Sequence, residues 1–153
     1  MCDKIPRETI ITEAKENEIT KRQEQWTSSI KGAVSKLFFL YIKERMKTML
    51  PISAESTAMV TGYGLTRSYL HRFKIIPNST CPCGLKEEQT INNKILNCTQ
   101  LKNERTILRN AVVRTGETWP PPFEQFTRNY IKTFTKFVNL FYLLKIEEIV
   151  HKW

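Results

Sequence analysis

The chain has 153 residues, which is enough for one domain or two very small ones. It carries 24 Lys and Arg against 15 Asp and Glu, and 41% of its residues are hydrophobic, so the composition argues against wholesale disorder and allows a modest core. Four clustered cysteines do not suit a disulfide-stabilised scaffold. No signal-peptide pattern opens the chain, and no apolar run reaches the roughly 20 residues of a membrane span. We therefore expect a nuclear or cytoplasmic protein with no membrane partner.

The first predicted element is a polar helix over residues 8–28, within an N-terminal linker segment of residues 1–30. Pro6 precedes it, at a position where the missing N–H group of proline costs little. Its apolar residues form only a thin stripe, and such a helix is marginal by itself in water. The next apolar run, residues 37–42, is too short for its periodicity to distinguish a buried strand from a helix.

Two short helices are predicted between residues 53 and 73. Ser53 is the candidate N-cap of the first, and Gly62 and Gly64 end it because glycine tolerates a positive φ. The second covers residues 66–73. Three more helices are predicted downstream, over residues 90–96, over residues 98–113, and from about Phe123 onward.

The C-terminal segment, residues 119–153, is predicted to be an amphipathic aromatic helix. Its large apolar residues recur at steps of three and four, at Phe126, Tyr130, Phe134, Phe137, Phe141 and Leu144. A stripe at this spacing normally faces a core, and otherwise a partner helix. Residues 31–118 form the basic helical module between the two ends. The predicted fold class is therefore mostly α, a small helical domain with a short cysteine-containing turn that is similar to a zinc knuckle.

Most of the positive charge lies in one part of the chain. Residues 31–75 contain eight Lys and Arg against two Glu, and such a surface attracts polyanions. Near the end of this stretch, cations and aromatic residues alternate, which is typical of proteins that bind unpaired nucleic acid. The candidate nucleic-acid-binding residues are Arg67, Tyr69, Arg72 and Lys74. The alternatives are that Tyr69 and Phe73 are core residues and that the basic face is only solvated.

Three cysteines form a possible metal site. Cys81 and Cys83 flank one proline, and Cys98 follows after fourteen further residues. Zinc takes four soft or borderline ligands in a tetrahedron, so the three thiolates fit it but leave one position open. The residues between Cys83 and Cys98 include no histidine, aspartate or cysteine, and an amide such as that of Asn93 is a poor zinc ligand. The alternative is three reduced cysteines without a metal.

Three blocks of sequence carry a resemblance to a known family. They are Thr61-Gly62-Tyr63-Gly64, the run Arg67-Ser68-Tyr69-Leu70-His71-Arg72-Phe73, and Cys81-Pro82-Cys83-Gly84. Together they resemble the C-terminal tail of the reverse transcriptase polyprotein of arthropod non-LTR retrotransposons, the jockey-like and I-like elements, downstream of the ribonuclease H region. The resemblance covers roughly residues 20–145.

The resemblance implies zinc ligands at Cys81, Cys83 and Cys98. Two positions depart from the family pattern: Tyr63 and Asn93 stand where the family has histidines, and the second of these is the fourth ligand. Zinc binding would then depend on His71 or a water molecule to complete the site.

Catalytic residues are missing from the sequence. Asp3 is the only aspartate, whereas polymerases, nucleases and ribonuclease H enzymes need carboxylate clusters to hold divalent metals. We therefore expect a non-catalytic fragment of a retrotransposon polyprotein that binds RNA or DNA through a basic helix and a degenerate zinc knuckle. The alternatives are a structural module that docks on the upstream polymerase or ribonuclease H domains without touching nucleic acid, and a decayed element copy.

Overall fold

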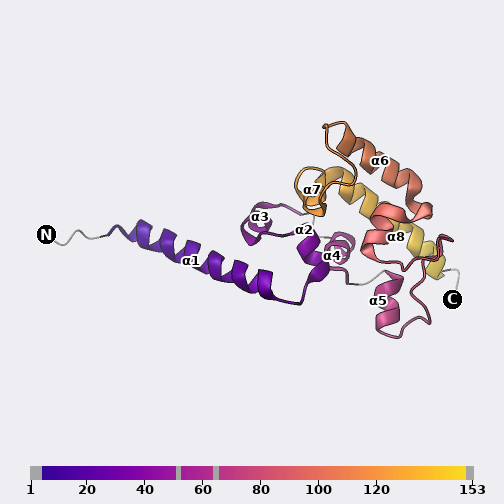
Figure 1. Cartoon of the computed structure of the whole chain (residues 1–153), viewed down its shortest axis with the longest axis horizontal. Coiled ribbons are helices and arrows are strands. Elements are labelled where there is room, and N and C mark those ends of the chain that lie inside the picture. Colours follow the sequence, from indigo (N-terminus) through magenta and orange to yellow (C-terminus); the bar gives the residue numbers. More distant parts are fainter. Residues whose placement is uncertain (1–4, 51–52, 64–65, 151–153) are drawn as a thin grey trace.

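The structure is a computed structural model that describes residues 5–50, 53–63 and 66–150, with side chains as far as Leu140. Its α-helices are α1 (Arg7–Ser28), α2 (Ala33–Phe38), α3 (Ile42–Lys47), α4 (Ala54–Thr61), α5 (Arg67–Arg72), α6 (Lys102–Val113), α7 (Phe123–Arg128) and α8 (Ile131–Val150) (Figure 1). Over the described ranges the only β pairing is an isolated bridge between Thr80 and Glu88. The predicted mostly helical fold is confirmed. No helix in the described part is long and apolar enough to cross a membrane.

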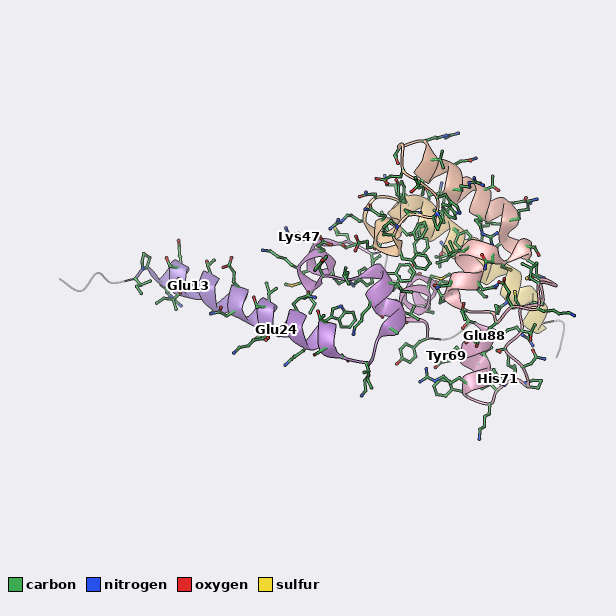
Figure 2. The ribbon with its side chains drawn as sticks, in the orientation of Figure 1. Glu13, Glu24, Lys47, Tyr69, His71 and Glu88 are labelled. Carbon is green, nitrogen blue, oxygen red and sulfur yellow. The ribbon has the colours of Figure 1, made fainter. Side chains whose placement is uncertain are left out.

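Helix α1 confirms the predicted polar helix and extends away from the rest of the molecule (Figures 1 and 2). None of its 22 residues is buried. Only its last turns are attached: Trp26 Nε1 donates to the carbonyl of Phe39 at 2.9 Å, and the Gln23 side chain bonds Leu40 O at 3.1 Å and Ile42 N at 2.8 Å. Polar contacts, rather than an apolar face, therefore hold α1 to the body.

The apolar run 37–42 is neither one strand nor one helix. Phe38 ends α2 and is buried, and the chain then bends before α3 begins at Ile42. The Gln23 side chain bridges this bend. The predicted N-cap of α4 is confirmed, because Ser53 Oγ accepts from Ser56 N at 3.0 Å.

Glycine ends α4 as the sequence predicts. Gly62 has a φ of 74°, and a Cβ atom there would also lie 2.8 Å from Val34 Cγ2. Both the backbone conformation and the close approach of α2 therefore require glycine at this position. Gly64 lies outside the described residues.

The core is a group of aromatic rings where α8 packs against α4, α6 and α7. Phe134 lies in the middle, with its ring centroid 5.2 Å from that of Phe126, 5.7 Å from Phe38 and 6.4 Å from Phe137. Phe126, Tyr130, Phe134 and Phe137 are all buried, so these four positions of the predicted stripe face the core. The side chains of Phe141 and Leu144 lie outside the described ones.

The prediction of a single helix from Phe123 onward is wrong. Helix α7 ends at Arg128 and α8 starts at Ile131, and the backbone N–H groups of Asn129 and Tyr130 both bond the carbonyl of Gln125. In a straight helix, positions 126 and 134 would lie about 12 Å apart along the axis. The break lets their rings stack at 5.2 Å, and the Tyr130 hydroxyl meets Thr115 Oγ1 at 2.6 Å. Ring stacking and this partly buried hydrogen bond therefore favour a break between α7 and α8 over one continuous helix.

Substitution Phe134→Ala is expected to destabilise the fold by about 3–5 kcal/mol, because it removes the central ring and leaves a cavity. Chemical denaturation followed by circular dichroism measures this loss. Ile107→Ala is the matched control, because Ile107 is 61% exposed on α6, and it should change stability by less than about 0.5 kcal/mol. Equal effects of the two variants would contradict a core centred on Phe134.

Candidate metal centre and nucleic-acid interface

A small hairpin positions the first two cysteines. Cys81 N donates to Glu87 O at 2.8 Å, and Gln89 N donates to Ser79 O at 2.8 Å. Between these bonds the chain reverses through Cys81-Pro82-Cys83-Gly84, and Gly84 has a φ of 88°. Glycine adopts this conformation without strain, which allows a turn tight enough for two sulfurs to point the same way.

A π-helical turn over Asn93–Asn97 brings in the third cysteine. The predicted helix over residues 90–96 is present only as a first turn at Ile91 and Asn92, after which the coil widens and Cys98 N bonds Asn93 O at 2.7 Å. The helix predicted from Cys98 starts as a 3₁₀ turn, Thr99–Leu101, and becomes α6 at Lys102. Such π turns are frequent at functional sites, because the wider coil re-aims the next residue.

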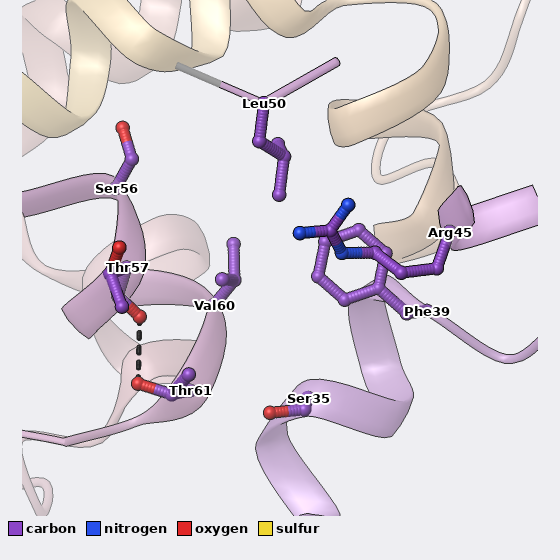
Figure 3. Close-up of a pocket in the computed structure, with 8 residues that line it drawn as sticks. All are labelled: Ser35, Phe39, Arg45, Leu50, Ser56, Thr57, Val60 and Thr61. Atoms are coloured by element: carbon purple, nitrogen blue, oxygen red, sulfur yellow. Dashed lines mark hydrogen bonds between the residues drawn. The ribbon is translucent and has the colours of Figure 1, made fainter. Parts of the chain in front are cut away.

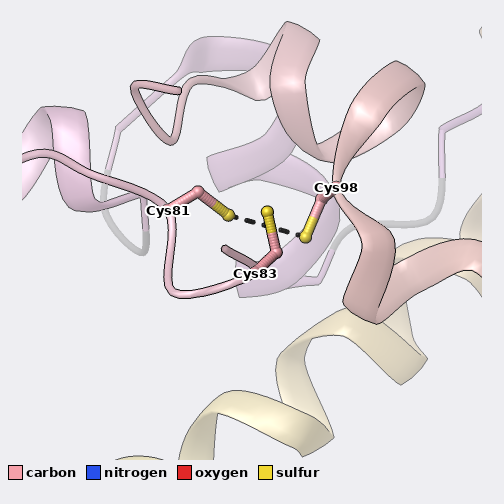
Figure 4. Close-up of side chains that lie close together, drawn as sticks. All are labelled: Cys81, Cys83 and Cys98. Carbon is pink, nitrogen blue, oxygen red and sulfur yellow. Dashed lines mark hydrogen bonds between the residues drawn. The ribbon is translucent and has the colours of Figure 1, made fainter. Parts of the chain in front are cut away.

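The three cysteine sulfurs meet (Figure 4). The Sγ atoms of Cys81, Cys83 and Cys98 all lie within 4.8 Å of one another, and those of Cys81 and Cys98 are 3.6 Å apart. A tetrahedral metal with bonds of about 2.3 Å to sulfur separates its sulfurs by about 3.8 Å. The structure therefore brings all three predicted ligands into a group that can hold a metal ion.

The fourth coordination position has no histidine. His71 is exposed on α5, and the group of possible ligands within the described residues consists of the three cysteines. Asn93 adjoins the group through its bond to Cys98 N and is buried. Its Nδ2 donates to Glu87 Oε2 at 2.7 Å, whereas its Oδ1 is buried without a hydrogen-bond partner among the described residues. A buried acceptor without a partner, on a residue whose backbone bonds that of Cys98, is compatible with a site that a metal or its bound water would complete.

Arg105 supplies positive charge beside the sulfurs. Its guanidinium donates to the carbonyls of Ile95 at 2.8 Å, Lys94 at 3.2 Å and Cys98 at 2.5 Å, which fixes it against the π-helical turn. Burial lowers the pKa of Arg105, and the sulfurs of Cys98 and Cys83 act in the opposite direction. Three thiolates and a divalent metal leave one net negative charge, which this guanidinium can balance.

Two of the thiols differ in acidity. Burial raises the pKa of Cys81 to about 12. Burial also acts to raise the pKa of Cys83, but hydrogen bonds from the backbone at Leu85 and Thr99 and from the other two thiols lower it to about 7. At neutral pH a metal therefore meets a Cys83 that is partly ionised already, and it must displace the proton of Cys81.

Helix α5 carries a second group of candidate residues. The Tyr69 ring lies between two others, with centroids 5.8 Å from Tyr63 and 4.7 Å from Phe73, and the Arg72 guanidinium lies 5.7 Å from the Phe73 centroid. Tyr63 is 66% exposed and Phe73 is 52% exposed, so the interpretation of Phe73 as a core residue is wrong. We call Tyr63, Tyr69, Arg72, Phe73 and Lys74 the α5 surface.

The four predicted nucleic-acid-binding residues have different environments. Arg72 and Lys74 are exposed, and Tyr69 is half-buried within the ring row. Arg67 is also half-buried, and its guanidinium donates to Asn78 Oδ1 at 3.0 Å, so it holds the following turn. Figure 2 shows Tyr69 and His71 on α5 with Glu88 nearby, and the carboxylate of Glu88 accepts from Ser68 Oγ at 2.7 Å.

A pocket of about 160 Å³ lies between α2, α3 and α4 (Figure 3). Phe39, Leu50 and Val60 give it apolar walls, and the Arg45 guanidinium covers the Phe39 ring at 5.0 Å. The rest of its lining is serine and threonine, without an acid, a histidine or a cysteine. The lining therefore offers no acid–base pair for catalysis.

Sequence reasoning did not find Gln89, Arg105 or the acceptor role of Glu87. Gln89 is buried and donates to Cys81 Sγ at 3.6 Å, and Glu87 accepts from both Asn93 and Asn97. None of the three belongs to a motif or to an apolar period, so no local pattern distinguishes them from solvated polar residues. Comparison of the chain with protein-family models, with curated proteins and with solved structures gives no match.

Substitution Arg105→Gln is expected to raise the dissociation constant for a divalent metal about 10- to 100-fold, because it removes the charge beside the thiolates. Titration with Co²⁺, followed by the absorption of cobalt–thiolate bonds, measures this. Arg109→Gln, at an exposed position of the same helix, is the charge-matched control. An unchanged metal affinity in Arg105→Gln would show that Arg105 does not contribute to metal binding.

Substitution Asn93→His is expected to tighten zinc binding about tenfold or more, because imidazole supplies the missing ligand. The Glu87 carboxylate that now accepts from Asn93 Nδ2 can accept from the ring N–H and orient it. Asn97→His is the control, because Asn97 also bonds Glu87 but is exposed. Competition with a chromogenic chelator compares the affinities, and no gain in Asn93→His would mean that position 93 does not reach the metal.

Metal affinity is expected to rise with pH. Above about pH 7 a metal must displace at least the proton of Cys81, so affinity should increase at least about tenfold per pH unit. Below about pH 7 Cys83 is protonated as well, so one further proton is displaced per metal and the slope should steepen by up to about another tenfold per unit. Zinc titrations in buffers of different pH, with a thiol-free reductant, give the slope of log affinity against pH. An affinity that does not change with pH would refute the prediction.

Proposed function

We propose that this chain is a non-catalytic module that binds single-stranded RNA or DNA on the α5 surface. One observation carries the proposal: the Tyr69 ring of α5 lies between those of Tyr63, which precedes the helix, and Phe73, which follows it, largely outside the core and beside two exposed cations. Unpaired bases stack on such rings for about 1–3 kcal/mol each, and Arg72 and Lys74 attract the phosphates.

The metal in this proposal is zinc, bound by Cys81, Cys83 and Cys98. Three thiolates suit zinc better than the harder divalent cations, and the short distance between sulfurs supports this choice. When bound, zinc cross-links the hairpin to the start of α6. Two residues support the bound metal: Arg105 balances the net negative charge of the metal–thiolate group, and Gln89 donates a hydrogen bond to Cys81 Sγ.

A retrotransposon origin agrees with this function. The motif residues that resemble the tails of non-LTR reverse transcriptase polyproteins include the α5 helix and the Cys81–Gly84 turn, which are the two parts of the proposed binding site. Within the described residues the one group of three or more candidate ligands that could hold a metal ion is the cysteine cluster, whose thiols suit zinc rather than the Mg²⁺ that polymerases and ribonuclease H use.

A second candidate function, docking on another protein, is favoured by α1. A helix of 22 residues with no buried side chain gains little from its own fold, so a partner that covers it would stabilise it. Under this alternative the chain binds upstream polymerase or ribonuclease H domains and ignores nucleic acid. Salt-dependent binding of an oligonucleotide by the chain alone distinguishes the two functions, because only the first requires it.

Binding of a fluorescent single-stranded oligonucleotide, measured by anisotropy over a range of salt, tests the α5 surface. Phe73→Ala should weaken binding about 5- to 100-fold through lost stacking, whereas Ile75→Ala, which removes an exposed neighbouring apolar side chain, should not. Arg72→Gln with Lys74→Gln should reduce the slope of log affinity against log salt by up to about two.

The charge-matched control for that pair is Arg109→Gln with Arg114→Gln, at exposed positions within α6 and just after its last residue. Equal loss in the two pairs would mean that net charge alone drives binding. Equal affinity for a duplex and a single strand would contradict recognition by stacking.

A further inference from the structure

Gln89 joins the cysteine group to α5. It is buried, with 6% of its surface exposed, and all of its polar groups are used. Its Nε2 donates to Cys81 Sγ at 3.6 Å, and its Oε1 accepts from Arg67 N at 3.0 Å. Its backbone carbonyl accepts from Ser68 N at 3.3 Å, and its backbone N–H donates to Ser79 O at 2.8 Å. One residue therefore contacts a candidate metal ligand and the start of α5 at the same time.

The start of α5 depends on this residue. The first N–H groups of a helix have no partner within it. Here Gln89 binds the N–H groups of Arg67 and Ser68, and Thr66 Oγ1 accepts from Tyr69 N at 3.2 Å. A helix of six residues is too short to be stable without such contacts. The contacts of Gln89 with the first turn of α5 therefore determine how the α5 surface is oriented.

The amide side chain of Gln89 makes both contacts because it presents a donor at one end and an acceptor at the other. A metal held by Cys81, Cys83 and Cys98 would fix the position of Cys81 Sγ, to which the Gln89 amide donates. With its donor end held there, the acceptor end of Gln89 stays directed at Arg67 N.

We propose that Gln89 is a positioning residue that couples metal binding at the cysteine group to the ordering of α5. Metal loading thereby raises affinity for single-stranded nucleic acid. The second part rests on the proposed function; the first does not.

The experiment uses the full chain, metal-free or saturated with Zn²⁺, under reducing conditions. Amide hydrogen exchange is measured over residues 67–73 and, as an internal reference, over α6. Anisotropy with a single-stranded oligonucleotide is measured in parallel. In the natural chain, zinc should slow exchange in α5 and raise affinity about 5- to 10-fold.

Gln89→Met keeps the volume of the side chain but removes both hydrogen bonds. It should bind Co²⁺ with cobalt–thiolate absorption, yet its α5 exchange and nucleic-acid affinity should no longer respond to metal. Thr99→Val is the matched control: it removes a 3.0 Å bond to the carbonyl of Cys83 without touching α5, and should respond to metal as the natural chain does. A normal metal response in Gln89→Met would overturn the proposal.

A second variant breaks the coupling at its far end, in case Gln89→Met fails to bind metal. Arg67→Pro removes the N–H that donates to Gln89 together with the guanidinium that bonds Asn78, whereas Arg67→Gln removes only the guanidinium and is therefore the matched control. Proline is tolerated at the first helical position, and Thr66 already has an extended backbone. Metal should bind normally but no longer protect α5, whereas Arg67→Gln should retain the protection. Protection that persists in Arg67→Pro, or its absence in the natural chain, would refute the coupling.

The two proposals fail differently. In one outcome neither the natural chain nor any variant binds nucleic acid, but zinc slows amide exchange in α5 wherever both Gln89 and the Arg67 N–H are present. The coupling is then correct and the proposed function is wrong. If nucleic acid binds equally with and without zinc, the α5 surface stands and the coupling is wrong.

Discussion

The convergence of three sulfurs is the contact on which the segment between α5 and α6 depends. That segment has one isolated bridge, a tight turn and a π-helical turn, and it buries Cys81 and Cys98 in the core together with Ile91, Ile95 and Leu101. This apolar burial offsets part of the cost of fixing the backbone, about 1–2 kcal/mol per residue. Under the proposed metal binding, a cross-link between Cys81, Cys83 and Cys98 adds further free energy in a single contact.

The body of the molecule is held together by the packing of buried aromatic and aliphatic side chains. Phe38, Phe126, Phe134 and Phe137 form a continuous group of rings between α2, α7 and α8, and Leu108 and Val112 add the inner face of α6. This group needs no metal. Removing metal should therefore loosen the cysteine hairpin and α5 while the aromatic core persists. Local opening of this kind is common at binding sites, where stability is lowest.

Sequence patterns predicted what depends on spacing. The cysteine spacing brought three sulfurs together, and the three-and-four spacing of rings placed four of them in the core. The break at Asn129 was missed because it depends on which rings stack across it, and no local pattern encodes that. Arg105 and Gln89 were missed for a similar reason: each has its partners seven or more residues away in the chain, and each resembles an ordinary surface polar residue.

The separation of core rings from surface rings bears on function. The Tyr69 ring contacts those of Tyr63 and Phe73, and among the described side chains none of the three pairs with a core phenylalanine ring, so their exposed faces are not needed to hold the fold. Exposed rings in contact are an unfavourable arrangement unless something stacks on them. Under the proposed function, that partner is a strand of unpaired bases, whose phosphates Arg72 and Lys74 attract. Gln89 holds α5 from its buried end and bonds Cys81, so under the proposed coupling a strand would bind this surface without disturbing the core, and the orientation of the surface would depend on the cysteines.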